Sequence, residues 1–139
     1  MVVKTGVSLP DELYEKLVSL AQRAGYPSIS KAIRDAVELF IAFNTWWSSQ
    51  GPVTGVLHLL AEAKHGSEIQ EALQDAEEVV EAVLYRRLGA SYIAVIVVVE
   101  GEPGRIKDLY KKLTRLRGVL AVQPALLPAP AAATRGVQG

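Results

Sequence analysis

Lys4, Gly6 and Ser8 stand at every second position near the amino end, and residues of these types at this spacing could read DNA. The residues between and beside them are Val3, Thr5, Val7 and Leu9. This period of two predicts a half-buried strand over residues 2–9, with the three candidate residues on its exposed face. When two such strands pair, the ribbon fits the DNA major groove, where side chains can hydrogen-bond to base edges.

A strand at residues 2–9 needs a partner, because one isolated strand is not stable in water. The two segments that follow it have helical patterns, so no partner strand is close in the sequence. We therefore expect the partner to be the same strand of a second chain, which makes the protein a dimer.

Two helices are predicted after this strand. The first begins at Pro10, is followed by acids that suit the helix dipole, and ends at Gly25, a residue favoured just past a helix end. Ser28 or Ser30 can cap the second helix. The residues that recur at helical spacing are Leu13, Leu17, Leu20 and Ala21, and then Ile33, Val37, Phe40, Ile41 and Asn44.

This order of strand, helix, glycine turn and serine-capped helix resembles the ribbon-helix-helix DNA-binding domain. The residues that carry the resemblance lie in 9–13, 25–26 and 30–36. It implies that Lys4, Gly6 and Ser8 are the base-reading positions, although the family usually has a hydrogen-bonding side chain where Gly6 stands. It further implies that the amides of Ser28, Ile29 and Ser30 hold a phosphate, and it places Lys31 and Arg34 toward DNA.

Residues 1–45 are thus expected to form this domain, and residues 46–52 a linker rich in Ser, Gly and Pro. Trp46 and Trp47 could pack the two domains together, or could finish the helix and cover apolar surface.

Residues 53–128 read as a second domain with the order β-α-β-β-α-β, the ferredoxin-like arrangement. The expected strands are 53–62, 79–88, 92–100 and 119–127, and the expected helices are 67–78 and 105–117. Strand 92–100 is so apolar that both of its faces should be covered. Residues 129–139, rich in Ala and Pro, are expected to be disordered. The fold class is therefore α+β.

Together, the two parts resemble the nickel-responsive regulator family (NikR-like), over residues 2–128. Marks of the second part are the segments 100–104, 117–119 and 126–128. The resemblance implies an ACT-like domain that assembles tetramers and senses metal, with nickel held by three His and one Cys. Those positions are occupied here by Gln74, Tyr85, Arg87 and Ile93. Because imidazole and thiolate hold this ion and Arg87 adds a permanent cation, we predict that the high-affinity nickel site is absent.

The second domain could then sense another small effector, or could only hold the assembly together. Glu77, Glu78 and Glu81 with His58 could offer oxygen ligands to a harder metal, or could be a solvated acidic helix end beside a strand histidine. His65 reads as a loop residue. A basic cluster in 105–117 could touch DNA backbone or an anionic effector, or could be an exposed helix whose cations complement its dipole.

Composition narrows the class of protein. The chain has 139 residues, half of them hydrophobic, and 15 basic residues balance 15 acidic ones. That balance argues against a strongly electrostatic nucleic-acid binder but leaves a local basic surface possible. The absence of cysteine excludes disulfides, thiolate metal sites and a thiol nucleophile. There is no bilayer-spanning run and no signal-peptide layout, so a cytoplasmic location is expected. The scarcity of labile residues fits a thermophile.

The sequence therefore predicts a DNA-binding transcriptional regulator, dimeric through the ribbon and tetrameric through the second domain, with double-stranded DNA and itself as partners and no membrane. The alternative is an oligomeric effector-binding or scaffolding protein whose ribbon only dimerises. An enzyme is not expected, because no Ser/His/Asp constellation, phosphate-binding glycine loop or carboxylate pair stands out.

Overall fold

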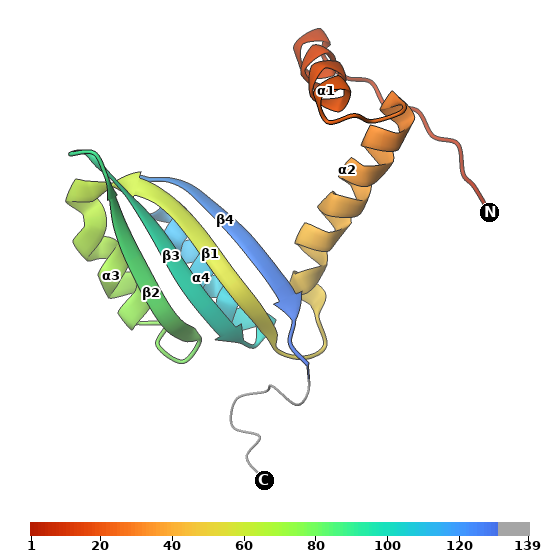
Figure 1. Cartoon of the computed structure of the whole chain (residues 1–139). Helices are drawn as coiled ribbons and strands as arrows, with labels where there is room; N and C mark the ends of the chain where they lie inside the picture. The colour runs from red at the N-terminus through yellow and green to blue at the C-terminus, as the bar shows by residue number, and fades with distance from the viewer. Residues whose placement is uncertain (131–139) are drawn as a thin grey trace. The chain divides into compact units, whose positions relative to one another are not determined.

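The computed structural model describes residues 1–130. They divide into two compact units, which are Met1–Ile41 and the described residues from Ala42 onward. Figure 1 shows the elements in chain order. They are α1 (Asp11–Arg23), α2 (Ile29–Asn44), the 3-10 helix η1 (Thr45–Ser48), β1 (Val53–Glu62), the 3-10 helix η2 (Ala63–His65), α3 (Gly66–Gln74), β2 (Val80–Leu88), β3 (Tyr92–Gly101), α4 (Pro103–Arg115) and β4 (Val119–Pro128).

The first unit contains the two predicted helices. The carboxyl end of α1 and the amino end of α2 are capped as the sequence predicts. Gly25 has a φ of +78°, a conformation that costs glycine nothing. The amide of Gly25 donates to the carbonyl of Gln22 (3.1 Å), and that of Tyr26 donates to the carbonyl of Ala21 (2.9 Å). These two bonds form a Schellman motif, which ends α1.

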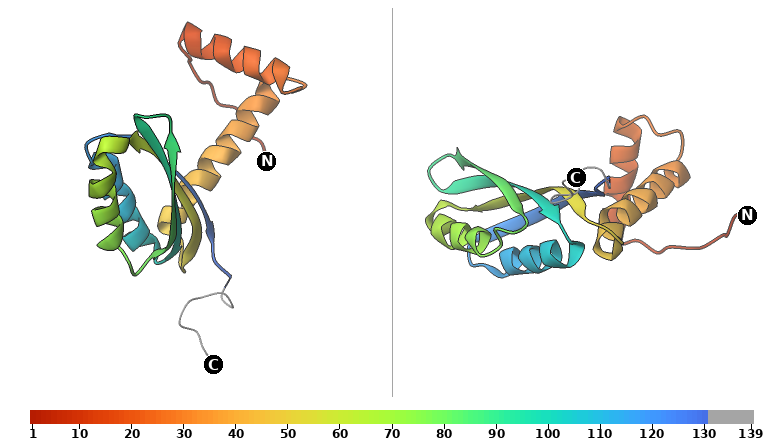
Figure 2. Two further views of the ribbon diagram at one scale, coloured as in Figure 1. Left: turned by 60° about the vertical axis from the view of Figure 1, so that its left-hand side comes forward. Right: turned by 90° about the horizontal axis from the view of Figure 1, so that it is seen from below.

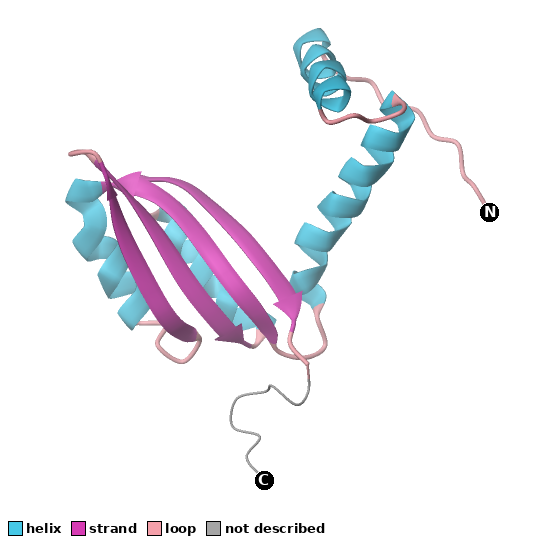
Figure 3. Ribbon diagram, viewed as in Figure 1, coloured by secondary structure: helices cyan, strands magenta, loops and turns pink. Residues whose placement is uncertain are grey.

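The strand predicted at residues 2–9 is absent from the single chain. Residues 1–8 are exposed and have no regular secondary structure, as the pink trace at the amino end of Figure 3 shows. Without a second strand, the backbone amides and carbonyls of this segment have no interstrand hydrogen-bond partners. This is the same reason for which a partner strand was expected. The expected ribbon therefore remains a prediction about the dimer.

The second unit has the predicted βαββαβ order. Its four strands form one antiparallel sheet in the order β2-β3-β1-β4, and α3 and α4 lie on the same face of that sheet (Figures 1 and 2). The core between the helices and the sheet includes Leu57, Val97, Ile69, Ile106 and Leu113, all fully buried. The alternation that predicted the strands thus places one face of each central strand in this core.

The other face of the sheet is not covered within the single chain, so one expectation is not met there. Residues of β3 alternate between complete burial, as at Val95 and Val97, and partial exposure, as at Ile96 and Val98. Strand 92–100 was expected to be covered on both faces, but in one chain only the helix-facing side is covered. Leu60 and Leu84 add to the uncovered apolar face. An apolar sheet face of this kind is usually buried by another molecule.

The start of the second unit corrects the expected linker at 46–52. Trp46 is 2% exposed and belongs to the core of this unit. Trp47 stacks on it at 3.8 Å between ring centroids and meets Tyr110 edge-on at 5.4 Å. Residues 45–48 form η1 rather than a loose connection. The indole rings therefore cover apolar surface, as one of the two interpretations of this pair proposed.

Smaller differences concern element ends. Helix α3 stops at Gln74, four residues earlier than expected, and Asp75–Val79 make turns before β2. Of the expected tail at 129–139, residues 131–139 lie outside the described residues, while the amide of Ala129 donates to the carbonyl of Pro52 at 2.9 Å.

Candidate nucleic-acid interface

The amino end of α2 is capped in a way that leaves free donors. The hydroxyl oxygen of Ser28 accepts a hydrogen bond from the amide of Lys31 at 3.1 Å, so Ser28 is the N-cap. In residues 1–130 the amides of Ile29 and Ser30 have no hydrogen-bond partner. Unpaired first-turn amides at the positive end of a helix are suited to binding a phosphate. The expected roles of Ser28, Ile29 and Ser30 in phosphate binding stay predictions that this geometry permits.

Lys31 forms an ion pair that was not predicted from the sequence. Its ammonium lies 2.7 Å from Asp35 Oδ1, one helical turn away. The hydrogen bond from Lys31 lowers the pKa of Asp35, to which Tyr26 also donates. The same carboxylate raises the pKa of Tyr26 through the hydrogen bond and its charge. The Lys31 and Asp35 spacing of four residues was the signal that could have revealed this cluster.

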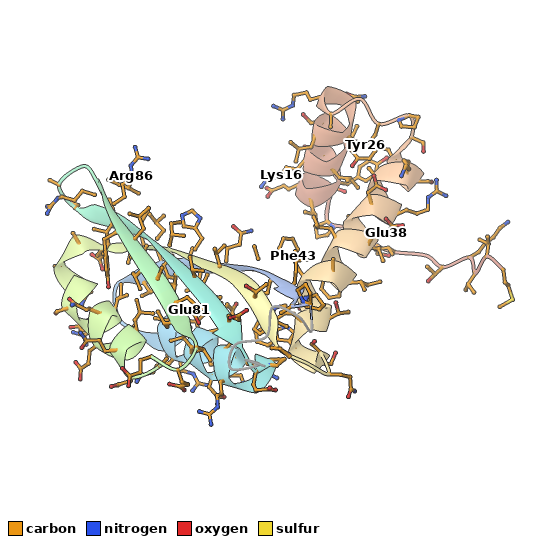
Figure 4. The ribbon with its side chains drawn as sticks, turned by 60° about the horizontal axis from the view of Figure 1, so that its bottom comes forward. Lys16, Tyr26, Glu38, Phe43, Glu81 and Arg86 are labelled. Atoms are coloured by element: carbon orange, nitrogen blue, oxygen red, sulfur yellow. The ribbon has the colours of Figure 1, made fainter. Side chains whose placement is uncertain are left out.

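Arg34 differs from Lys31 in having no ion pair within residues 1–130. Arg34 is exposed in the second turn of α2. Tyr26 lies in the turn between the two helices (Figure 4). Lys31 and Arg34 are the two cations expected to face DNA. Arg34 can bind an anion without first losing an ion pair within the described chain.

The three base-reading candidates are all exposed, but so are their apolar neighbours. Lys4, Gly6 and Ser8 have no hydrogen-bond or ion-pair partner in the described chain. Val3 and Val7 are 76% and 70% exposed. A single chain thus hides neither face of the segment, and the sorting into a buried and a reading face requires a second chain.

The first unit also lacks a core of its own. Its buried residues are only Ala21 and Ala32. On α2, the predicted apolar face is left open, with exposed fractions from 36% to 68% at Ile33, Val37, Phe40 and Ile41. Two helices that bury two alanines cannot offset the entropy of folding. The apolar face of α2 is therefore not covered by any other part of the first unit.

The positions aligned with the nickel ligands lie close together in the second unit. Tyr85 and Arg87 are on β2, and Arg87 pairs in register with Ile93 of β3. Gln74 and Tyr85 both line a hollow of about 310 Å³ between α3 and β2. Burial raises the pKa of Tyr85. An amide, a phenol, a guanidinium and an alkyl side chain do not form a donor set for square-planar nickel.

Among residues 1–130, no three His, Cys, Asp or Glu side chains gather where they could hold a metal ion. Glu78 pairs instead with Arg105 at 3.2 Å. The ring of His65 lies 2.7 Å from Glu68 Oε2, so this residue, expected to be a simple loop residue, has a defined partner. His58 is exposed on the open sheet face. The suggested oxygen-ligand site of His58 with three glutamates is thus not assembled.

Within the described part of the chain, no helix combines the length and apolar character needed to cross a bilayer.

Two family models match the chain, one for each unit. Residues 3–42 match the ribbon-helix-helix protein model of the copG family, and residues 55–127 match the nickel-binding C-terminal domain of NikR. A Thermococcus onnurineus protein named "Putative nickel-responsive regulator" is 31% identical over 121 residues, which are 85% of this chain and 88% of that protein. A Methanococcus maripaludis protein of the same name is 29% identical over 125 residues, 86% of this chain and 88% of that protein.

Among solved structures, the C-terminal domain of the MgtC protein from Mycobacterium tuberculosis is similar with a TM-score of 0.45 and 13% identity. That match covers 59% of this chain and 90% of the other.

Proposed function

We propose a function from the premise that the chain belongs to the nickel-responsive regulator (NikR) family, a family of transcriptional regulators. The protein binds double-stranded DNA as a dimer through its amino-terminal unit, and its second unit joins dimers into a tetramer. It does so in the cytoplasm and without the high-affinity nickel site of the family.

The observation that carries this proposal is the incomplete first unit. Residues 1–8 are exposed and unpaired, and α2 presents an open apolar face. A second copy would satisfy both needs at once, because paired strands complete each other's ladder and the apolar faces of the helices bury each other. The resulting ribbon carries Lys4 and Ser8 toward base edges and the amides of Ile29 and Ser30 toward a phosphate.

Tetramer formation is supported by the open face of the sheet in the second unit. Leu60, Leu84, Val98 and Leu127 are more than a third exposed there. A second sheet packed against this face would cover β3 on both sides. Two dimers held in one assembly would then bind two half-sites and gain affinity by avidity.

The loss of nickel binding is proposed from the chemistry of the substituted positions. Gln74 and Tyr85 offer weak oxygen donors, Ile93 offers none, and Arg87 would bring a positive charge beside the ion. If an effector binds this unit, the hollow between α3 and β2 that Gln74 and Tyr85 line is the place to look for it.

The test begins with selection of bound sequences from genomic DNA fragments and continues with fluorescence anisotropy on the recovered site and on random DNA. We expect Lys4→Ala to weaken binding to the selected site about 5- to 140-fold, which corresponds to 1–3 kcal/mol for a good base contact. Lys16→Ala is the matched control, because Lys16 is an exposed cation on α1 (Figure 4) and should change affinity about twofold or less. Equal effects of both changes would contradict base reading by the ribbon.

A second candidate function is an effector-binding or scaffolding oligomer whose ribbon only dimerises. Two features favour this candidate. The five basic and five acidic residues of the first unit give it no net charge, and Gly6 has no side chain that could contact a base. Thermal-shift screening with amino acids, nucleotides and divalent metals separates the two. Stabilisation by such a ligand, with no selected DNA sequence, would favour this candidate.

A further inference from the structure

The charges of this neutral chain are strongly segregated. The first unit, residues 1–41, has a formal charge of zero, with Lys4, Lys16, Arg23, Lys31 and Arg34 against Asp11, Glu12, Glu15, Asp35 and Glu38. Residues 103–117, which hold α4, have six basic residues and one acidic residue, a formal charge of +5. Affinity for DNA comes largely from cations that neutralise phosphates. The unit expected to read DNA therefore has little of the charge that such binding needs, and α4 has it.

The ion pairs of α4 divide its cations into two groups. Arg105 lies 3.2 Å from Glu78 Oε1, and Lys112 lies 3.1 Å from Asp75 Oδ2, so both are paired with acids that follow α3. The other four cations have no ion pair in the described chain: Lys107, Lys111, Arg115 and Arg117.

Three of the unpaired cations form a stripe along the helix. Lys107, Lys111 and Arg115 are spaced four residues apart, and at 1.5 Å of rise per residue they extend over about 12 Å. Lys111 and Arg115 are exposed on the side opposite the buried Ile106, Leu109 and Leu113. We call these three cations the α4 stripe.

The like charges of the α4 stripe repel each other, and the compensating interactions lie at its two ends, Lys107 and Arg115. Like charges four residues apart in a helix repel each other. The helix dipole compensates cations in the last turn, which includes Arg115 but not Lys107 or Lys111. Lys107 has one compensating contact, since its ammonium lies 5.3 Å from the ring of Trp47. A solvated helix face would gain more from alternating charges than from this arrangement.

We propose that the α4 stripe is a second DNA-binding surface, which contacts the phosphate backbone of the bound duplex without reading its sequence. This inference rests on the proposed function and adds the source of its electrostatic affinity. Arg115 can grip a phosphate with two parallel hydrogen bonds, while Lys107 and Lys111 act as point charges. A stripe of basic residues along one helix is the footprint expected of such a surface. The neutral net charge of the chain is no obstacle, because only the charges that face the phosphates count.

The experiment measures how the DNA affinity of the full chain depends on salt, for the double variant Lys111→Gln, Arg115→Gln. Each lost phosphate contact lowers the slope of log affinity against log salt by about 0.9. For two contacts, the affinity drop between 50 and 200 mM salt should be about 12-fold smaller per bound chain than in the wild type. The decrease in slope should be equal for selected and random DNA sequences, because contacts to the phosphate backbone are sequence-independent.

The matched control is the double variant Arg105→Gln, Lys112→Gln, which removes the same charge from the same helix. Its cations are already paired with Glu78 and Asp75, so we expect its salt slope to match the wild type. Circular dichroism melts of both variants check that the sheet and helices are intact.

Four outcomes would overturn the inference. An unchanged slope in the Lys111, Arg115 variant, with wild-type binding to DNA, rejects the α4 stripe and leaves the proposed function standing. Equal slope losses in both double variants mean that general charge, not this stripe, is responsible. If the wild type binds no DNA, the proposed function and this inference both fall. Binding of wild type but not variant to anionic vesicles, with an unchanged DNA slope, would identify a lipid surface instead.

Discussion

Replacing Gly55 by alanine tests how closely β1 and β4 are joined in the second unit. Gly55 pairs with Leu126 across these strands and has a φ of +156°, which residues with a Cβ rarely adopt. A Cβ built on Gly55 meets the carbonyl oxygen of Ala125 in an overlap, and it lies 3.0 Å from the Cα of Leu126. Because both obstacles are backbone, no side-chain rotation can relieve them.

The expected cost follows from what must move. Strain at such a backbone conformation costs about 1–3 kcal/mol, and separating β4 from β1 here breaks ladder hydrogen bonds worth about 1 kcal/mol each. A total of about 3 kcal/mol lowers the melting temperature of a domain of this size by about 12–24 °C. The assay is a circular dichroism melt at fixed protein concentration, since association shifts apparent stability.

Gly104→Ala is the matched control for Gly55→Ala. Gly104 lies in the first turn of α4, and a Cβ there meets nothing within 4 Å. Alanine should stabilise that helix by up to about 1 kcal/mol and raise the melting temperature slightly. A Gly55→Ala protein that melts within about 2 °C of the wild type would refute the reasoning. A loss of about 3 kcal/mol in the free energy of unfolding must lower the melting temperature of a domain of this size by much more than that.

Three further predictions concern association, pH and metal. Val37→Ala removes two methyl groups that are half exposed in one chain and that the partner would bury in the proposed dimer, worth about 0.8 kcal/mol per chain. Over two chains this raises the dimer dissociation constant about 15-fold in sedimentation equilibrium, and an unchanged constant would place the interface elsewhere. Because Asp35 raises the pKa of Tyr26, the stabilising contribution of their bond is complete below the ordinary tyrosine pKa near 10 and is lost as the pH rises through the folded pKa. At the acid end, the pKa of Asp35 is lowered, so its contribution is complete above the ordinary aspartate pKa and is lost as the pH falls through the folded value. Asp35→Ala should shift the tyrosinate absorbance titration of Tyr26 toward its ordinary pKa, and an unshifted curve would refute the contact. In calorimetry with Ni²⁺ we expect no tight stoichiometric complex, and one such complex would disprove the argument from the substituted ligand positions.

The proposed division of labour gives each unit a distinct role in DNA binding. The first unit would supply reading groups with no net charge, and α4 would supply charge with no reading groups. Specificity and electrostatic affinity are separable contributions in protein–DNA recognition. Their separation onto different units would let an effector bound to the second unit alter affinity without changing the sequence that is read.

Local chemistry in the sequence determined the elements and their order. The helix that ends at Gly25 and the one capped by Ser28 could be predicted because each cap depends on residues within one turn. The βαββαβ order could be predicted because periods of 2 and 3.6 are properties of short segments. The family resemblance added the candidate DNA positions, and the family-model matches over residues 3–42 and 55–127 agree with it.

Tertiary structure decided what depends on residues distant in sequence or on another chain. Nothing local to Trp46 indicates that it enters the core of the second unit, since its neighbours there lie on α4 and β4. Arg105 and Lys112 pair with acids 27 and 37 residues earlier, which is likewise a product of how α3 and α4 pack. Within the described residues this leaves Lys111 and Arg115 without an ion pair. The strand expected at residues 2–9 marks the opposite limit. Its pattern is in the sequence, but a ladder needs a second backbone, and a single folded chain does not provide one.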